Sequence, residues 1–383
     1  MSRQTFTTKL SIVADVIQGQ SPESQFYSDS EGIPFLQGNR TFGNLYPSFD
    51  TYTKKVTKLA RKGEVLMSVR APVGALNFAP CDLCIGRGLA SINAKNGDNR
   101  FVYYALKYNV ENLIKQGGAT TFDSVNKDLI NDFELIIPSE DTDRRKVSAV
   151  LSTLDDKIEL NNKINADLEQ MVKTLYDYWF VQFDFPVKNG KPYKSSGGAM
   201  LYNEELKREI PKDWEVKKLS DLLPVVTGKQ DANFATKDGK YNFFTCGEEI
   251  LKCDTHEFEG KAVLIAGNGN FNIKLYDGKF NAYQRTYVLI PNEEKHYTIV
   301  YMGVRDRLRW LTSGSRGSIV KFITKGDLED ILIPLPKDEN LDVFSSLNIL
   351  SEKIAKNIEE NQKFAELRDW LLPMLMNGQV AVK

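Results

Sequence analysis

The chain contains 383 residues, of which 42% are hydrophobic and 26% charged, and this length allows two globular domains that each bury a core. No apolar run is long enough to span a membrane and the first residues are polar, so we expect a cytoplasmic protein with no membrane partner. Four cysteines do not form a disulfide framework, and the net charge of −1 neither favours nor excludes a nucleic-acid partner.

Residues 1–139 have the composition of a mixed, strand-rich domain. Short apolar runs at Glu64–Val69 and Glu134–Ile137 predict strands, and the apolar spacing from about residue 100 to residue 115 predicts a helix. A polar stretch then closes the domain, and Asp143 is placed to cap the helix that follows.

Residues 140–183 predict one long helix with an apolar seam that recurs every 3.5 positions, which over four heptads is typical of a supercoiled helix pair. The seam residues are Val147, Leu151, Leu154, Ile158, Asn161, Asn165, Leu168, Val172, Leu175 and Trp179. Adding 196 to each number gives a second seam, made of Val343, Leu347, Leu350, Ile354, Asn357, Asn361, Phe364, Arg368, Leu371 and Leu375.

Two asparagines fall at the same place in each copy of this seam. Buried Asn side chains penalise every register that leaves them opposite apolar groups. We therefore predict that the two helices pack as an antiparallel coiled coil whose register is set by Asn161, Asn165, Asn357 and Asn361. The alternative is two unrelated amphipathic helices, each lying on its own domain, which does not explain the matched asparagines.

The segment 184–211 is rich in Pro and Gly and predicts a linker, after which the plan of the first domain restarts at residues 212–336. The stretch Lys325–Pro336 aligns without gaps on Lys127–Pro138, which pairs Asp330 with Asp132. Residues 337–383 supply a second long helix, from about Leu341 until Pro373 ends or kinks it.

The predicted fold class is α+β. Two strand-rich α/β domains are separated by two long helices packed as an antiparallel coiled coil, and the whole forms an internal pseudo-twofold repeat. Both helical stretches are net acidic, with 6 Lys and Arg against 9 Asp and Glu in residues 140–183, and 6 against 8 in residues 337–383.

The sequence carries little that is typical of catalysis. Both histidines, His256 and His296, lie in the second copy of the repeat and have no counterpart in the first. The stretch Cys81–Cys84 has the spacing of zinc ligands but lacks a second matching pair. Cys246, Cys253 and His256 lie in the second domain, so they could complete that site only if the two domains shared it. No Gly-rich loop opens a helix, so no nucleotide or methyl-donor site is visible. We expect a non-catalytic chain without a metal or cofactor of its own.

The loops of both domains contain side chains suited to nucleic acid. Arg and Lys can bridge guanine edges, Asn and Gln can bridge adenine, and small Gly or Ser loops bring backbone amides to phosphates. The candidate residues are Lys54, Lys55, Lys58, Arg61, Arg70, Arg87, Gly117, Gly118, Thr120 and Thr121 in the first domain and Asn268, Asn270, Lys274, Tyr283, Gln284, Arg285, Ser315, Arg316 and Ser318 in the second. Two copies of a scaffold with different loops suit the reading of two different short sequences.

Three stretches give the chain a family resemblance. They are Lys62–Gly74 (KGEVLMSVRAPVG), Cys84–Ala90 (CIGRGLA) and Ile210–Leu219 (IPKDWEVKKL). With the repeated layout they make the chain resemble the DNA-specificity (S) subunit of type I restriction–modification systems over nearly its whole length. Two departures stand out. The stretches that follow the two domains, Ser139–Arg145 and Lys337–Asn340, differ from the family's usual acidic-Gln-Arg run, and Asn281–Arg285 contains no counterpart of the Gly-Arg-Gly of the first domain.

The resemblance implies that each globular half is a target recognition domain for one part of a split site in double-stranded DNA. The helices would form a spacer that docks modification (methyltransferase) subunits and, through them, restriction (translocase and nuclease) subunits. S-adenosylmethionine, ATP and Mg would belong to those partners. The alternative is a helix-tethered adaptor whose globular halves bind protein or carbohydrate.

Overall fold

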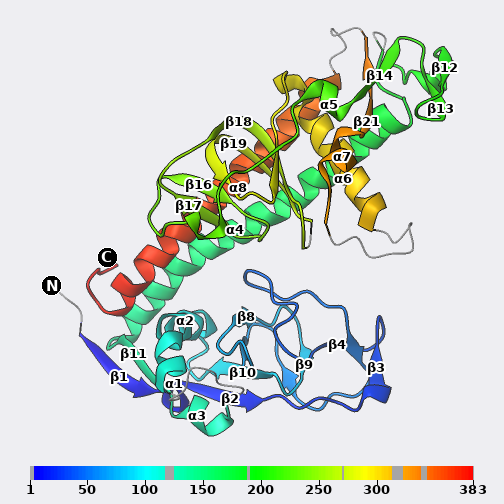
Figure 1. Ribbon diagram of the computed structural model, residues 1–383. Helices are drawn as coiled ribbons and strands as arrows, with labels where there is room; N and C mark the ends of the chain where they lie inside the picture. Colours follow the sequence, from blue (N-terminus) through cyan, green and yellow to red (C-terminus); the bar gives the residue numbers. More distant parts are fainter. Residues whose placement is uncertain are drawn as a thin grey trace. The chain divides into compact units, whose positions relative to one another are not determined.

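The computed structural model describes residues 4–116, 125–187, 190–269, 271–312, 322–337 and 343–382. The chain divides into two compact units, of which the first contains Met1–Leu160 and Glu360–Lys383 and the second contains Asn161–Glu359. Each of the two long helices, α4 (Asp141–Tyr176) and α8 (Val343–Met376), therefore contributes one half to each unit (Figure 1).

The first unit contains an antiparallel pair β1-β11, a four-stranded sheet of order β2-β10-β7-β8 and a five-stranded sheet of order β3-β5-β4-β9-β6. Its strands are β1 (Thr5–Lys9), β2 (Ala14–Gln18), β3 (Tyr27–Ser28), β4 (Ile33–Leu36), β5 (Tyr52–Thr53), β6 (Leu59–Ala60), β7 (Val65–Ser68), β8 (Leu76–Phe78), β9 (Leu83–Ile85), β10 (Leu89–Ala94) and β11 (Glu134–Pro138). Its other helices are α1 (Leu10–Val13), α2 (Asn99–Gln116) and α3 (Lys127–Asn131). The predicted helix at 100–115 and the two predicted strands are confirmed as α2, β7 and β11.

The second unit repeats this plan, and its two longest strands are β18 and β19. It contains a hairpin β12-β13, an antiparallel pair β14-β21 and a six-stranded sheet of order β15-β20-β18-β19-β16-β17. The strands are β12 (Met200–Asn203), β13 (Arg208–Pro211), β14 (Trp214–Lys218), β15 (Val226–Thr227), β16 (Tyr241–Phe244), β17 (Ile250–Cys253), β18 (Phe258–Ala266), β19 (Ile273–Ala282), β20 (Thr286–Leu289) and β21 (Leu332–Pro336). The helices are α5 (Leu219–Leu222), α6 (Tyr297–Thr312) and α7 (Lys325–Glu329).

In each unit one central strand lies between two hydrophobic cores. Side chains alternate between the two faces of a strand, and in β7 Val65 and Met67 face the core that contains α2 while Leu66 faces the core of the five-stranded sheet. In β18, Val263 and Ile265 face the core that contains α6, and Leu264 faces a second core. This double burial is the reason that both strands read as continuous apolar runs rather than alternating ones.

The repeat also holds for polar contacts. Lys9 at the end of β1 bonds to Asp132 at 2.7 Å, and Lys218 at the end of β14 bonds to Asp330 at 2.8 Å. The pairing of Asp132 with Asp330 predicted from the sequence therefore corresponds to one salt bridge made twice.

The segment 184–211, interpreted from its Pro and Gly content as a linker, contains the hairpin β12-β13. The chain that leads into it is packed, since the rings of Phe183 and Phe185 lie 5.4 and 5.1 Å from that of Trp214. Ile210 also belongs to this core. Apolar side chains spaced among turn residues bury themselves here without helical or strand periodicity, so periodicity did not reveal them.

Two details of the long helices differ from the sequence-based expectation. Asp143 does not cap α4, because the helix begins at Asp141 and the carbonyl of Glu140 accepts the amides of Asp143 and Arg144. Pro373 lies inside α8 and does not end it, since the helix continues to Met376, while the alternative that Pro373 kinks the helix stays a prediction. Proline removes only one helical hydrogen bond so close to the terminus, and its own carbonyl still accepts the amide of Asn377 at 3.0 Å.

The seam of the helix pair is built as predicted, since every one of its positions is buried or half-buried. In the second unit the amide of Asn357 donates to Oδ1 of Asn165 at 2.7 Å, and both side chains are buried. Asn161 is buried in the second unit and Asn361 is half-buried in the first, so their mutual pairing stays a prediction.

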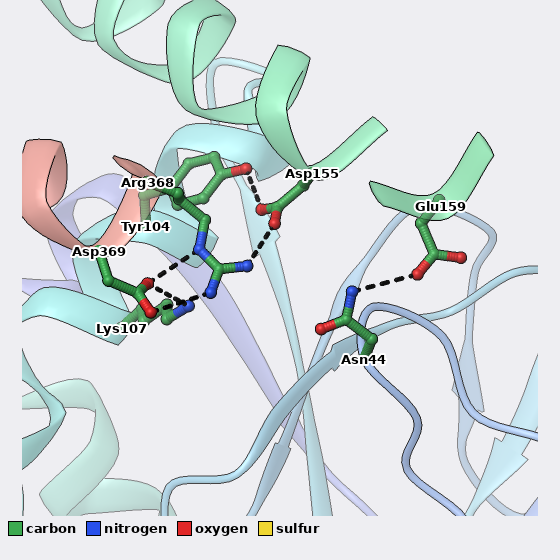
Figure 2. A network of polar contacts seen from close by, with 7 residues as sticks. All are labelled: Asn44, Tyr104, Lys107, Asp155, Glu159, Arg368 and Asp369. Carbon is green, nitrogen blue, oxygen red and sulfur yellow. Dashed lines mark hydrogen bonds and ion pairs between the residues drawn. The ribbon is translucent and has the colours of Figure 1, made fainter. Parts of the chain in front are cut away.

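The first unit adds a buried polar network that the seam pattern did not predict (Figure 2). Asp155 on α4 is fully buried and accepts hydrogen bonds at 2.5 Å from both the Tyr104 hydroxyl on α2 and the Arg368 guanidinium on α8. Arg368 also binds Asp369, which accepts a bond from Lys107 at 3.2 Å.

The predicted α+β fold class, with two strand-rich domains and two long helices, is confirmed.

Candidate nucleic-acid interface

A tight turn at Gly86–Gly88 joins β9 to β10 in the first unit. The Gly86 amide donates to the Leu36 carbonyl at 2.8 Å, the Leu89 amide donates back to the Gly86 carbonyl at 3.0 Å, and the Val69 amide donates to the Gly88 carbonyl at 2.9 Å. A Cβ on Gly88 would lie 2.6 Å from the carbonyl oxygen of Gln37, which is closer than real Cβ atoms come. The turn therefore presents one side chain, the exposed Arg87.

The second unit has the same turn at Tyr283–Arg285, between β19 and β20. The Tyr283 amide donates to the Phe244 carbonyl at 2.9 Å, the Thr286 amide to the Tyr283 carbonyl at 2.8 Å, and the Gly267 amide to the Arg285 carbonyl at 2.9 Å. These three bonds match those of the first unit one by one. They place Gln284 at the position of Arg87, and Arg285 at the position of Gly88. The stretch that contains no Gly-Arg-Gly in its sequence thus keeps the same backbone turn with different side chains.

One glycine supports each turn from the neighbouring strand. Gly19 donates to the Leu89 carbonyl at 2.9 Å, and Gly228 donates to the Thr286 carbonyl at 3.0 Å. A Cβ at these glycines would lie 2.2 Å from the Gly86 carbonyl oxygen and 2.0 Å from that of Ala282. Only glycine fits at either position, and the sequence analysis did not single out these two residues.

Each turn opens on a cavity. In the first unit a cavity of about 580 Å³ is lined by Arg87, Arg40, Gln37 and Ser21, among others. In the second unit a cavity of about 350 Å³ is lined by Gln284, Arg285 and Asn268 together with Thr227, Tyr287, Phe322 and others. The structure therefore brings together three of the predicted residues of the second domain, and it joins Arg87 to Arg40 and Gln37, which were not predicted.

The guanidinium groups at the two turns are free to meet a ligand, and the Gln284 carboxamide is free in part. Arg87 and Arg285 are exposed, and within the described residues neither guanidinium takes part in a hydrogen bond or an ion pair. Gln284 is exposed and its amide nitrogen donates to Asp231 at 2.9 Å. A carboxylate can only accept hydrogen bonds, so the Gln284 amide nitrogen must face Asp231. The amide oxygen of Gln284 then points away from Asp231 and is free.

The remaining predicted cations have other surroundings. Lys54 and Lys55 form surface ion pairs with Glu31 and Glu23 at 2.5 and 3.3 Å, and Lys58, Arg61 and Arg70 are exposed without lining either cavity. Lys274 faces its own chain and donates to the carbonyls of Thr245 and Gly247, and burial lowers its pKa. Tyr283 is half-buried within the turn. Gly117, Gly118, Thr120, Thr121, Asn270, Ser315, Arg316 and Ser318 lie outside the described residues.

The residues that sequence reasoning missed lie beside strands rather than in charged clusters. Arg40 follows β4 in the polar run Gln37–Arg40 and bonds to Asp50 at 2.5 Å. Phe322 is 64% exposed next to the second turn, where an apolar residue gives no surface signal in the sequence.

In the described part of the chain no three His, Cys, Asp or Glu side chains gather closely enough to hold a metal ion. No helix there is long and apolar enough to cross a membrane.

Comparison with known proteins assigns this scaffold. The family model of the type I restriction modification DNA specificity domain matches residues 6–170 and again residues 211–363. The chain therefore belongs to the family of type I restriction–modification DNA specificity proteins, with two copies of the domain.

Relatives agree with this assignment. The MjaIX specificity subunit of Methanocaldococcus jannaschii is 28% identical over 98% of this chain and 93% of its own length. The EcoDI specificity subunit of Escherichia coli is 38% identical, over 45% of this chain and 40% of its own length. A crystal structure of the type I S subunit from M. genitalium shares the fold, with a TM-score of 0.62 at 16% identity over 98% of this chain and 96% of that one.

Proposed function

We propose that this chain is the sequence-specific DNA-binding subunit of a type I restriction–modification complex, and that each unit binds one half of a two-part site in duplex DNA. The observation that carries the proposal is the turn that both units build with the same backbone bonds and different side chains. A backbone frame shared by the two units positions the reading groups, and the exchanged side chains change the sequence that is read. The chain itself is non-catalytic in this proposal.

The second part of the proposal concerns protein partners. The helices are net acidic and therefore poor ligands for DNA, but they present apolar side chains. Met171 on α4 and Leu367 on α8 stand at equivalent positions of the repeat and are 51% and 42% exposed. We infer that these positions contribute to two equivalent docking sites for modification (methyltransferase) subunits. Restriction subunits would join through them, and S-adenosylmethionine, ATP and Mg would be bound by these partners.

A gel-shift titration of the purified chain over a range of salt concentrations tests DNA binding. Contacts to phosphates release counterions, so the affinity should fall steeply and linearly on a double-logarithmic plot against salt. An adaptor that binds protein or carbohydrate would not shift duplex DNA at any salt concentration, and that result would remove the proposal.

A domain exchange tests the division of labour. Residues 212–336 are replaced by the corresponding domain of a relative, and the methylated motif is mapped in a host that carries the complete complex. One half of the motif should change and the other should persist. If both halves change, or neither does, the units do not read independently.

A further inference from the structure

The two turns differ at the one position where both present a side chain to their cavity. Arg87 and Gln284 occupy equivalent positions of the two turns. The residue before each donates its amide to a backbone carbonyl, and the residue after each accepts a backbone amide with its carbonyl. A difference between the halves of a bound sequence would therefore be expressed first at these two residues.

The chemistry of the two side chains selects different bases. Guanine presents two acceptors, N7 and O6, in the major groove, and a guanidinium offers two parallel donors to them. Adenine presents an acceptor and a donor, N7 and the N6 amino group, which match the nitrogen and oxygen of a carboxamide. Arg87 is exposed and unpaired within the described residues, so its fork is free to make the guanine contact.

The surroundings of Gln284 favour the adenine contact. Asp231 holds one hydrogen of the amide nitrogen at 2.9 Å, which leaves the second hydrogen for N7 and the oxygen for the N6 amino group. Phe322, 64% exposed, lines the same cavity. An apolar ring beside the carboxamide suits the methyl group of the thymine that pairs with adenine. The cavity beside Arg87 lies on the other side of its turn, next to Leu36 and Gln37, and it contains a second guanidinium, that of Arg40.

We propose that Arg87 reads a guanine in one half-site and that Gln284 reads an adenine in the other. This inference rests on the proposed function, and it adds the identity of one base in each half-site. Arg285 has no counterpart side chain in the first unit, where Gly88 occupies its position, so it supplies an additional contact to the second half-site.

The test is selection and sequencing of bound duplexes from a pool with randomised positions, with the purified full-length chain. The wild-type chain should select a two-part motif. Arg87→Gln should convert one G·C pair of one half into A·T and leave the other half unchanged, and Gln284→Arg should do the reverse in the other half. For the original site, each variant should bind about 10-fold to 100-fold more weakly, the range of one lost bidentate base contact.

Arg145→Gln is the matched control, because Arg145 is an exposed arginine on α4 that makes an ion pair with Asp141 and lines neither cavity. It should leave the motif as it is. If the wild-type chain selects a motif and the variants at Arg87 and Gln284 weaken all sequences equally, these side chains contact phosphates and the inference is wrong while the proposed function stands. If the wild-type chain selects no motif, both are wrong.

Discussion

At the scale of single residues, two cations of the second domain have different surroundings. Lys274 and Arg285 both belong to the predicted contacts of the second domain. Lys274 is half-buried, and its ammonium group donates to the carbonyls of Thr245 and Gly247. Arg285 is exposed and lines the cavity beside Gln284. The Lys274 ammonium group is therefore bound within the protein, whereas the Arg285 guanidinium is open to a ligand.

Replacing each of them by methionine separates these tasks. Lys274→Met should lower the free energy of unfolding by about 1–3 kcal/mol, because two carbonyls lose a charged donor, and should leave the salt dependence of DNA binding unchanged. Arg285→Met should keep stability within about 0.5 kcal/mol and reduce the slope of the salt dependence by about one phosphate contact. Chemical denaturation and salt titration measure the two effects. An equal loss of slope in both variants would show that Lys274 also reaches DNA.

Part of the candidate interface can be predicted from residue types alone. Arg87, Asn268, Gln284 and Arg285 were identified because their side chains suit base edges and phosphates. The equivalence of Arg87 with Gln284 was out of reach, because it depends on backbone hydrogen bonds to strands far away in the chain. Gly19 and Gly228 illustrate the same limit: a lone glycine gives no sign of the carbonyl that will lie against it.

At the scale of elements, one position of the helix seam is charged in the first unit and apolar in the second. In the first unit Tyr104, Asp155 and Arg368 form a buried hydrogen-bonded set. The offset of 196 residues aligns Asp155 with Ser351 and Arg368 with Val172 in the second unit, and both of these side chains are fully buried. Within the described residues the Ser351 hydroxyl has no hydrogen-bond partner. Burial and the nearby Asp155 carboxylate raise the pKa of the Tyr104 phenol, which therefore stays protonated as a donor.

The Arg368–Asp155 pair of the first unit can be replaced by the residues that stand at the equivalent positions of the second unit. Arg368→Val leaves the buried Asp155 carboxylate without its cation and should lower the free energy of unfolding by about 3–5 kcal/mol. Adding Asp155→Ser should recover most of this loss, because the pair then matches Val172 and Ser351 of the second unit. Denaturant unfolding of the single and double variants measures the coupling. A single variant as stable as the wild type would show that the ion pair contributes nothing to the helix pair.

The asparagine pair of the second unit allows a similar experiment with the opposite sign. Replacing both Asn165 and Asn357 by leucine should raise the melting temperature, since a polar contact in the seam becomes apolar, and should loosen the choice of register and partner. Asn165→Leu alone should lower it, because the Asn357 amide loses its acceptor at a cost of about 1–3 kcal/mol. Thermal unfolding and size-exclusion chromatography are the measurements. A double variant less stable than the single one would contradict this account.

The elements themselves were predictable to different degrees. The helix seam was clear in the sequence because its period persists over the whole length of α4 and α8. The hairpin β12-β13 was not, since a short hairpin among turn residues has no sustained period. Arg368 stands in the seam as an apparent exception to the apolar pattern, and only the buried Asp155 opposite explains it.

At the scale of the whole molecule, the internal repeat was the strongest prediction, and it rests on agreement at several levels. The Lys–Asp salt bridge, the turn supported by a glycine and the central strand between two cores each occur once in each unit. A repeat with an exchanged reading position is what a protein needs to recognise two different half-sites with one scaffold. In the proposed function the helices set the distance between those half-sites.

The last prediction concerns that distance. With 36 residues in α4 and 34 in α8, each helix is about 50 Å long at ~1.5 Å per residue. The boundary between the two units falls after Leu160 in α4 and after Glu359 in α8. Inserting four residues at both points lengthens the pair by ~6 Å, and B-DNA rises ~3.4 Å per base pair, so we expect unchanged half-sites separated by about two more base pairs.

The insertion must be made in both helices, because lengthening one alone would set the seams out of register. Four residues are close to one helical turn and disturb the supercoil only as a stutter. Two added base pairs also rotate the second half-site about the DNA axis, and the deformation needed to meet both units will reduce affinity. Methylation mapped on a library of random spacers, with the complete complex, measures the preferred spacing. Full activity at the original spacing would show that the helices do not set it.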